Sequence, residues 1–520
     1  MKRLLNGNYS SPTLAKKEQK RHNTVRGEEK HRLGIKTDYG RAVFKQLQET
    51  IQQVEKLTVE IREIKSTHKM EIARLDTEIE SLRKENTSLK AENQKLKAII
   101  NKDRGNSSKP PSSDGFKKIY NSREKTDRAP GGQHGHKGIV PVLHENPEII
   151  IEHKQERCAC GGKVVYPDTH QAKQKVEIEI KAVVTEHRSY TGVCENCNAK
   201  VKNDMPLNDI ITYGETIKAF AVMLSSEGLV SINRIKTMLY EITNGAINVS
   251  EGTIAKWNKD LSGKLASFIE EIKEKLLVLP VLHKDESGVR INNSLQWFHV
   301  LSGKAYTLYF TNKKRGNEAD REIGILPAYS GVLVHDHLKG LYSFSCEHAE
   351  CNAHILRYLK SVVETTKRAW ASAMIVFLTD ANNSVKRHKA NNNSAFDGVE
   401  IAGYHARYDE ILGQGWLEFI QDEKKDYNGE DMKLYRRLKE YKREHLRFLS
   451  DFQVPFDNNQ AERDLRMIKS KTKVSGCFRG SDGGSVFANI KSFTSTMRKN
   501  SRNIFDGLKA VFLGEALSWA

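Results

Sequence analysis

The sequence predicts a multidomain α/β protein on three observations. A heptad repeat ends near residue 100, two cysteine pairs follow residue 150, and short apolar runs after residue 276 end close to acidic residues. We therefore expect an N-terminal parallel coiled coil, a small zinc-ribbon-like cysteine-pair domain, a helical region and a domain built on a mixed sheet. A length of 520 residues leaves room for several such domains.

The composition favours a soluble protein with an anionic partner. The chain has 84 Lys and Arg against 66 Asp and Glu, a formal charge of +18, so nucleic acid is the first candidate. A hydrophobic content of 38% argues against a wholly disordered chain, and seven cysteines are too few for a disulfide scaffold. Because no signal peptide and no run of about twenty apolar residues is evident, we expect a cytosolic protein with no membrane partner.

Residues 1–40 predict a basic disordered arm. They carry ten Lys and Arg against four Asp and Glu, with few large apolar residues. The arm is either a DNA-contacting tail or a solvated terminus.

Residues 41–100 predict a leucine zipper. The d positions of the heptad are Leu75, Leu82, Leu89 and Leu96, and the a positions are Ile72, Ile79, Asn86, Asn93 and Ile100. Acidic g positions precede basic e positions by five residues, in the pairs Glu78–Arg83, Glu85–Lys90 and Glu92–Lys97. This is the spacing of interhelical pairs in a parallel dimer, and Asn at a favours two strands. The alternative is a solvated single helix.

Residues 101–140 predict a basic linker without a core. Proline, glycine and serine dominate in NSSKPPSSDG and APGGQHGHKG. The linker either lies along DNA as a basic strap or serves only as a spacer between domains.

Residues 141–206 predict a cysteine-pair domain, in which residues 175–184 and 186–193 alternate like strands. The pairs are Cys158 with Cys160 and Cys194 with Cys197. In a reducing compartment, two such pairs favour a structural Zn²⁺ site, although the first is one residue shorter than the usual knuckle. His153 and His187 are substitute ligands, and four ordinary cysteines are the alternative.

Residues 207–276 predict three helices. Apolar residues recur at helical spacing over 217–224 and 232–242, and Ser250 is placed to cap a third helix. This order resembles a helix-turn-helix, whose last helix would enter a DNA groove. A helical packing module is the alternative.

The region after residue 276 predicts strands that end in acids. An apolar run over 276–283 leads to Asp285, further strands follow at 297–301 and 306–310, and a strand at 332–334 ends at Asp336. Carboxylates at the ends of adjacent strands can share a divalent cation, and this strand order suggests an RNase H-like sheet. The alternative is that both acids are ordinary turn residues.

A third carboxylate is expected on a helix that starts after Pro455. There Glu462, Arg466 and Lys469 would lie on one face, a carboxylate for the cation beside two positive charges for phosphate. The alternative is a plain surface pair of Glu462 and Arg466.

The chain is similar to bacterial insertion-sequence transposases of the DDE class, and most closely resembles the TnpC-type transposases of insertion-sequence family sixty-six. The resemblance covers nearly the whole chain from about residue 45 and rests on five stretches: NSSKPPSSDG, GGQHGHKG, LHKDESGVRI, VHDHLKGLYSF and FDNNQAERDLR. It implies a catalytic domain over 277–367 and 451–520, interrupted by a helical insertion over 368–450.

The resemblance also implies roles for individual residues. Asp285, Asp336 and Glu462 become the catalytic triad, holding two Mg²⁺ (or Mn²⁺) ions for in-line phosphoryl transfer. His354 and Arg357 are expected to brace or line the site, and Arg466 and Lys469 to face DNA. Cys351, which forms a C-x-x-H stretch with His354, is expected only to pack.

The implied function is 3′-end cleavage and strand transfer at the ends of an insertion sequence, in a nucleoid-associated protein of the bacterial cytosol. The implied partners are element ends, target DNA and a second copy of the chain, and the resemblance leaves open whether accessory proteins of the element take part. Two alternatives stay open: a non-catalytic DNA-binding regulator, and an RNase H-like nuclease that cuts without joining.

Overall fold

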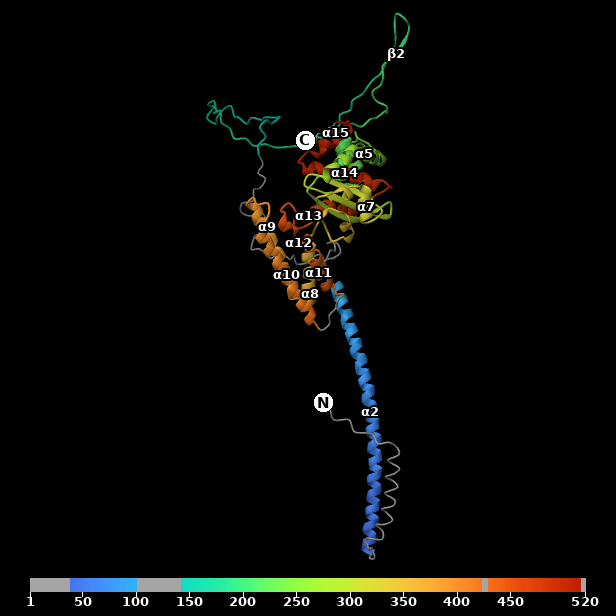
Figure 1. Cartoon of the computed structure of the whole chain (residues 1–520). Coiled ribbons are helices and arrows are strands. Elements are labelled where there is room, and N and C mark those ends of the chain that lie inside the picture. Colours follow the sequence, from blue (N-terminus) through green and yellow to red (C-terminus); the bar gives the residue numbers. More distant parts are fainter. Residues whose placement is uncertain (1–37, 101–141, 423–428, 516–520) are drawn as a thin grey trace. The chain divides into compact units, whose positions relative to one another are not determined.

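The computed structural model describes residues 38–100, 142–422 and 429–515, in two units (Figure 1). The first unit is essentially one helix, α2 (Asp38–Ile100), and the second holds all later elements. The predicted arm, apart from the first turn of α2, and the predicted linker lie outside the described residues. Among the helices of the described ranges, none combines the length and hydrophobicity needed to cross a membrane.

Helix α2 leaves its heptad side chains in water. Its d residues Leu75, Leu82, Leu89 and Leu96 are each between 44% and 56% exposed. An apolar row on an isolated helix provides a surface for another helix, because single helices bury little apolar area on their own.

The centre of the second unit is a five-stranded mixed sheet with the order β5-β4-β3-β6-β7. Its strands are β3 (Val281–Ile291), β4 (Ser294–Ser302), β5 (Thr307–Asn312), β6 (Val332–His335) and β7 (Glu347–Glu350). The first three form an antiparallel meander, and β6 and β7 run parallel to β3. A two-residue turn at Asn292 and Asn293, both with positive φ, joins β3 to β4, as tight hairpins require.

The sheet corrects two details of the sequence prediction. The apolar run over 276–283 spans two elements, because Leu276 and Leu277 finish helix α6 and the strand begins at Val281. Asp285 therefore lies inside β3 and not at its end, since β3 continues along β4 after its parallel partner β6 has stopped. Strand β7 was not predicted at all.

One face of the sheet shares its core with the helical region. Helices α3 (Glu215–Ser226), α4 (Ile232–Ile242), α5 (Glu251–Lys264) and α6 (Ala266–Leu277) pack there with α14 (Gly483–Lys499) and α15 (Ile504–Leu513). The predicted Ser250 cap is confirmed, since its hydroxyl accepts the Thr253 N–H at 3.0 Å. Ile254, Trp257 and Leu261 of α5 are buried in this core, so α5 is a packing helix with one face left exposed.

The opposite face of the sheet is covered by α13 (Asn459–Ser475). Ala461, Leu465 and Ile468 of this helix form one core with Phe298 and Val300 of β4. The apolar spacing i, i+4, i+7 places these three side chains on one stripe of the helix.

A separate helical core lies between β7 and α13 in the chain. It consists of α8 (Asn352–Thr366), α9 (Ala369–Ala390), α10 (Gly398–Gln421), α11 (Glu430–Glu440) and α12 (Lys442–Ser450). Helices therefore occur over most of the predicted insertion, as expected from its composition.

The cysteine-pair region has less sheet than predicted. Within residues 175–193 the only strand is β1 (Thr191–Val193), which pairs with β2 (Lys200–Lys202). Apolar side chains such as Ile178 and Val184 are more than 80% exposed. Among the described residues no strand lies beside 175–190 to bond its backbone, so the alternating pattern forms no sheet there.

Replacing Leu465 with Ala should lower the free energy of unfolding by about 3 kcal/mol, because Leu465 is 0% exposed between α13 and the sheet. Val474→Ala, in the same helix but 57% exposed, is the matched control and should cost less than about 0.5 kcal/mol. Urea unfolding followed by circular dichroism measures both. Equal effects for the two variants would contradict the packing described for α13.

Candidate active site

Two of the three predicted carboxylates come from neighbouring parallel strands. In the β3–β6 register Leu282 lies opposite Leu333 and Lys284 opposite His335, so Asp285 and Asp336 are the next residues along. Side chains alternate between the faces of a strand, which puts Asp285 on the face covered by α13.

The Asp285 carboxyl holds a proton more tightly than an ordinary aspartate. Removal from water is the largest cause, and the negative charges of Asp336 and Glu286 add to it, raising the pKa of Asp285 to about 7. The backbone N–H of Glu286, 2.8 Å from Asp285 Oδ1, and the charge of Lys469 act in the opposite direction. Lys469 of α13 therefore influences Asp285 electrostatically.

The third carboxylate, Glu462, belongs to the first turn of α13. Glu462 and Asp336 both lie close to the same histidine, His354. Nδ1 of His354 lies 3.0 Å from Asp336 Oδ1 and 3.8 Å from Glu462 Oε1. Arg357 donates to His354 Nε2 at 3.0 Å and lies 3.9 Å from Glu462. Since arginine is only a donor, Nε2 accepts and the histidine proton sits on Nδ1, facing the acids.

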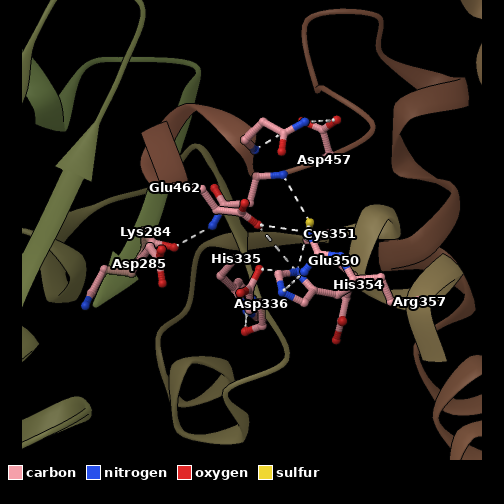
Figure 2. A network of polar contacts seen from close by, with 12 residues as sticks. Lys284, Asp285, His335, Asp336, Glu350, Cys351, His354, Arg357, Asp457 and Glu462 are labelled. Carbon is pink, nitrogen blue, oxygen red and sulfur yellow. Dashed lines mark hydrogen bonds and ion pairs between the residues drawn. The ribbon is translucent and has the colours of Figure 1, made fainter. Parts of the chain in front are cut away.

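Cys351 is part of this cluster, whereas the sequence suggested only a packing role. Its sulfur lies 3.4 Å from His354 Nδ1, and burial raises the pKa of the Cys351 thiol well above its usual range. One ligand atom from each of Asp336, Cys351, His354 and Glu462 lies within 4.8 Å of the others. Figure 2 shows these side chains together and Asp285 to one side of them.

The carboxylates fit a divalent cation. Among the described residues, Asp336 Oδ1 and Glu462 Oε1 are buried oxygens that accept no hydrogen bond. A buried acceptor without a donor is costly, and carboxylate oxygens are the ligands that Mg²⁺ and Mn²⁺ prefer. A cation at this place would satisfy both oxygens.

A cavity of about 220 Å³ gives access to Asp285 and Asp336. Its walls include Asp285, Asp336 and His354 together with the positive charges of Arg315 and Arg437. A larger cavity, about 660 Å³, lies between α9 and α10 and shares no lining residue with it. The smaller cavity combines acids for a cation with positive charges for an anionic substrate.

Glu350 supports the site and was missed by the sequence reasoning. This residue of β7 is 1% exposed and accepts hydrogen bonds from Tyr342 at 2.6 Å, from His337 and from Arg437. Burial alone would raise the pKa of Glu350, but His337, His445 and Arg437 outweigh it and hold that pKa well below its usual range. No spacing in the sequence indicates this role, because the strand itself is short and polar.

The other predicted site residues are two positive residues of α13 and the four cysteines. Arg466 and Lys469 are exposed on α13. The four cysteines form two pairs on tight turns, and within the described residues they do not gather into one group. Backbone N–H groups of Cys160 and Cys197 lower the pKa of the Cys158 and Cys194 thiols, respectively, which favours thiolates.

Comparison with known families gives two matches. The model described as "Transposase IS66 family" matches residues 211–486, more than half of the 520-residue chain and a stretch that contains all three carboxylates. A model described as "Family of unknown function (DUF6444)" matches residues 46–140. No curated protein matches the chain.

The raised pKa of Asp285 predicts how stability depends on pH without metal. The folded state binds a proton that the unfolded state releases near pH 4, so the free energy of unfolding should fall as pH rises from about 4 to about 7. Asp285→Asn should remove this part of the pH dependence. Urea unfolding in EDTA at several pH values measures the difference, with the exposed Asp506→Asn as control. A slope unchanged by Asp285→Asn would contradict the pKa.

Proposed function

Because the chain belongs to the IS66 family of transposases, we propose that it cuts DNA at the ends of an insertion sequence and joins those ends to target DNA. The observation that carries the proposal has two parts: Asp285 and Asp336 line one cavity, and buried oxygens of Asp336 and Glu462, both close to His354, accept no hydrogen bond. The sheet order β5-β4-β3-β6-β7, with three antiparallel strands and two parallel ones, supports an RNase H-like catalytic domain.

In this proposal Asp285, Asp336 and Glu462 hold Mg²⁺ or Mn²⁺, which would stabilise the charge that develops on the phosphate and activate the attacking oxygen. Water attacks the phosphorus at the element end, and the bond from phosphorus to the 3′-oxygen breaks. The freed 3′-hydroxyl then attacks a phosphorus of target DNA, the bond from that phosphorus to its own 3′-oxygen breaks, and the released 3′-oxygen takes up a proton to become a hydroxyl. No bond between protein and DNA forms.

The other residues of the site bind and orient. His354 places its Nδ1 3.0 Å from Asp336 Oδ1 and bonds to Cys351 Sγ, and Arg357 fixes His354 in turn. Arg466 and Lys469 on the exposed face of α13 would hold the DNA backbone next to the acids, because arginine and lysine pair with phosphate. Lys469 also offsets part of the repulsion on Asp285.

The proposal assigns supporting roles to the rest of the chain. The exposed faces of α3–α5 would bind the element ends. Each cysteine pair lies on a turn whose backbone N–H groups favour thiolate. Zn²⁺ would be held by Cys158, Cys160, Cys194 and Cys197 once the two pairs, which are apart in the structure, come together. The exposed heptad of α2 would join two copies in parallel, so that one complex holds two DNA ends.

Asp285→Ala, Asp336→Asn and Glu462→Gln should each lower Mg²⁺-dependent end cleavage by at least about 1,000-fold, because the acids act as one unit. Binding of the same DNA should stay within about twofold, since the positive charges remain. Cleavage and joining are measured on DNA that carries the element ends, with Asp506→Asn as the matched control. Cleavage without joining by the intact protein would favour a nuclease, and binding without cleavage a regulator.

The coiled-coil proposal has a test of its own. Replacing Leu82 and Leu89 together with Lys should shift the full chain from dimer to monomer, because charge at d removes the apolar seam. The matched control adds the same charges one residue earlier, at Ser81 and Ser88 on the outer face of the heptad. Light scattering after size exclusion measures the mass. A dimer that survives the leucine changes would contradict the heptad interface.

A further inference from the structure

Asn458 is a buried asparagine at the meeting point of the segments that carry the three carboxylates. Its side chain is 0% exposed, with Oδ1 2.9 Å from His283 Nδ1 and Nδ2 donating to the Lys284 carbonyl at 2.7 Å. Its backbone N–H donates to Cys351 Sγ at 3.2 Å, and its carbonyl accepts the Glu462 N–H at 3.2 Å. One residue thus bonds to β3, to the start of α8 and to α13.

Each of these bonds fixes a different acid. His283 and Lys284 directly precede Asp285 in β3. The hydrogen bond from the Glu462 N–H to the Asn458 carbonyl closes the first turn of α13, and this turn orients the Glu462 side chain. The Cys351 sulfur also accepts from His354, whose Nδ1 lies against Asp336. Asn458 therefore bonds to Glu462 itself and to the two residues before Asp285, and it is linked to Asp336 through Cys351 and His354.

The position requires asparagine for a chemical reason. It needs a donor at one end of a planar group, for the Lys284 carbonyl, and an acceptor at the other. Because Nδ2 is the donor, Oδ1 is the acceptor, and the His283 proton must sit on Nδ1. An aspartate would place a second acceptor against the Lys284 carbonyl at a position that is 0% exposed.

We propose that Asn458 is the positioning residue of the active site: it sets the distances among the three carboxylates and thereby the affinity for the divalent cation. The proposal rests on the function proposed above. Asn458 touches no reacting atom and acts only through the residues it holds. Its neighbour Asn459 bonds Asp457 instead, with Nδ2 2.5 Å from Oδ2, and provides a matched asparagine outside the network.

The test measures Mn²⁺ binding to the metal-free full chain by electron paramagnetic resonance, which needs no DNA and no turnover. Asn458→Asp keeps the shape and loses the donor, and it should weaken Mn²⁺ binding about 10- to 100-fold, the usual effect of removing support from a metal ligand. The Mn²⁺ concentration for half-maximal end cleavage should rise by the same factor, with a smaller fall in the rate at saturation. Asn459→Ala should stay within about twofold of the intact protein.

Two variants of His283 test the same network in case the Asn458 variant does not fold. His283→Leu removes only the bond to Oδ1 and should weaken Mn²⁺ binding several-fold, whereas His283→Asn retains a donor there and should restore it. Thermal unfolding in EDTA shows which variants fold. Folded Asn458→Asp or His283→Leu protein that binds Mn²⁺ as tightly as the intact chain overturns the proposal. If the intact chain binds no Mn²⁺, or Asp285→Ala binds it equally well, the proposed function itself fails.

Discussion

The apolar contact between α13 and the sheet keeps three acidic side chains together against their mutual repulsion. Ala461, Leu465 and Ile468 press on Phe298 and Val300, and this contact fixes the start of the helix over β3. Burial is the main cause of the high pKa of Asp285, and the negative charges of Asp336 and Glu286 add to it. Apolar packing, rather than ion pairing, therefore holds the carboxylates at fixed places, where a bound cation can neutralise their charge.

Local patterns in the sequence were sufficient for much of this arrangement. The heptad of α2, the Ser250 cap and the helix that carries Glu462 each follow from residues close together in the chain. The paired runs before Asp285 and Asp336 indicated two of the strands. Periodicity shows which residues share a face of one element, and that was enough to predict the three acids as site residues.

What the sequence could not predict depends on contacts between distant segments. Strand β7 reads as polar, yet Glu350 is buried there because Arg437, some ninety residues later, supplies its positive charge. The alternating segment at 175–190 lacks a neighbouring strand among the described residues and forms no sheet. Asn458 resembles an ordinary helix-start residue in the sequence, and only the fold shows that both ends of its amide are used inside the protein.

The burial of Cys351 has a consequence for chemical labelling. This sulfur is 0% exposed and bonded on two sides, while Cys158, Cys160 and Cys197 are exposed. An alkylating reagent can therefore react with Cys351 only after the contact between the starts of α8 and α13 has opened. The rate of that slow reaction reports the free energy of local opening at the site itself, so the chain contains a native probe of how firmly its acids are held.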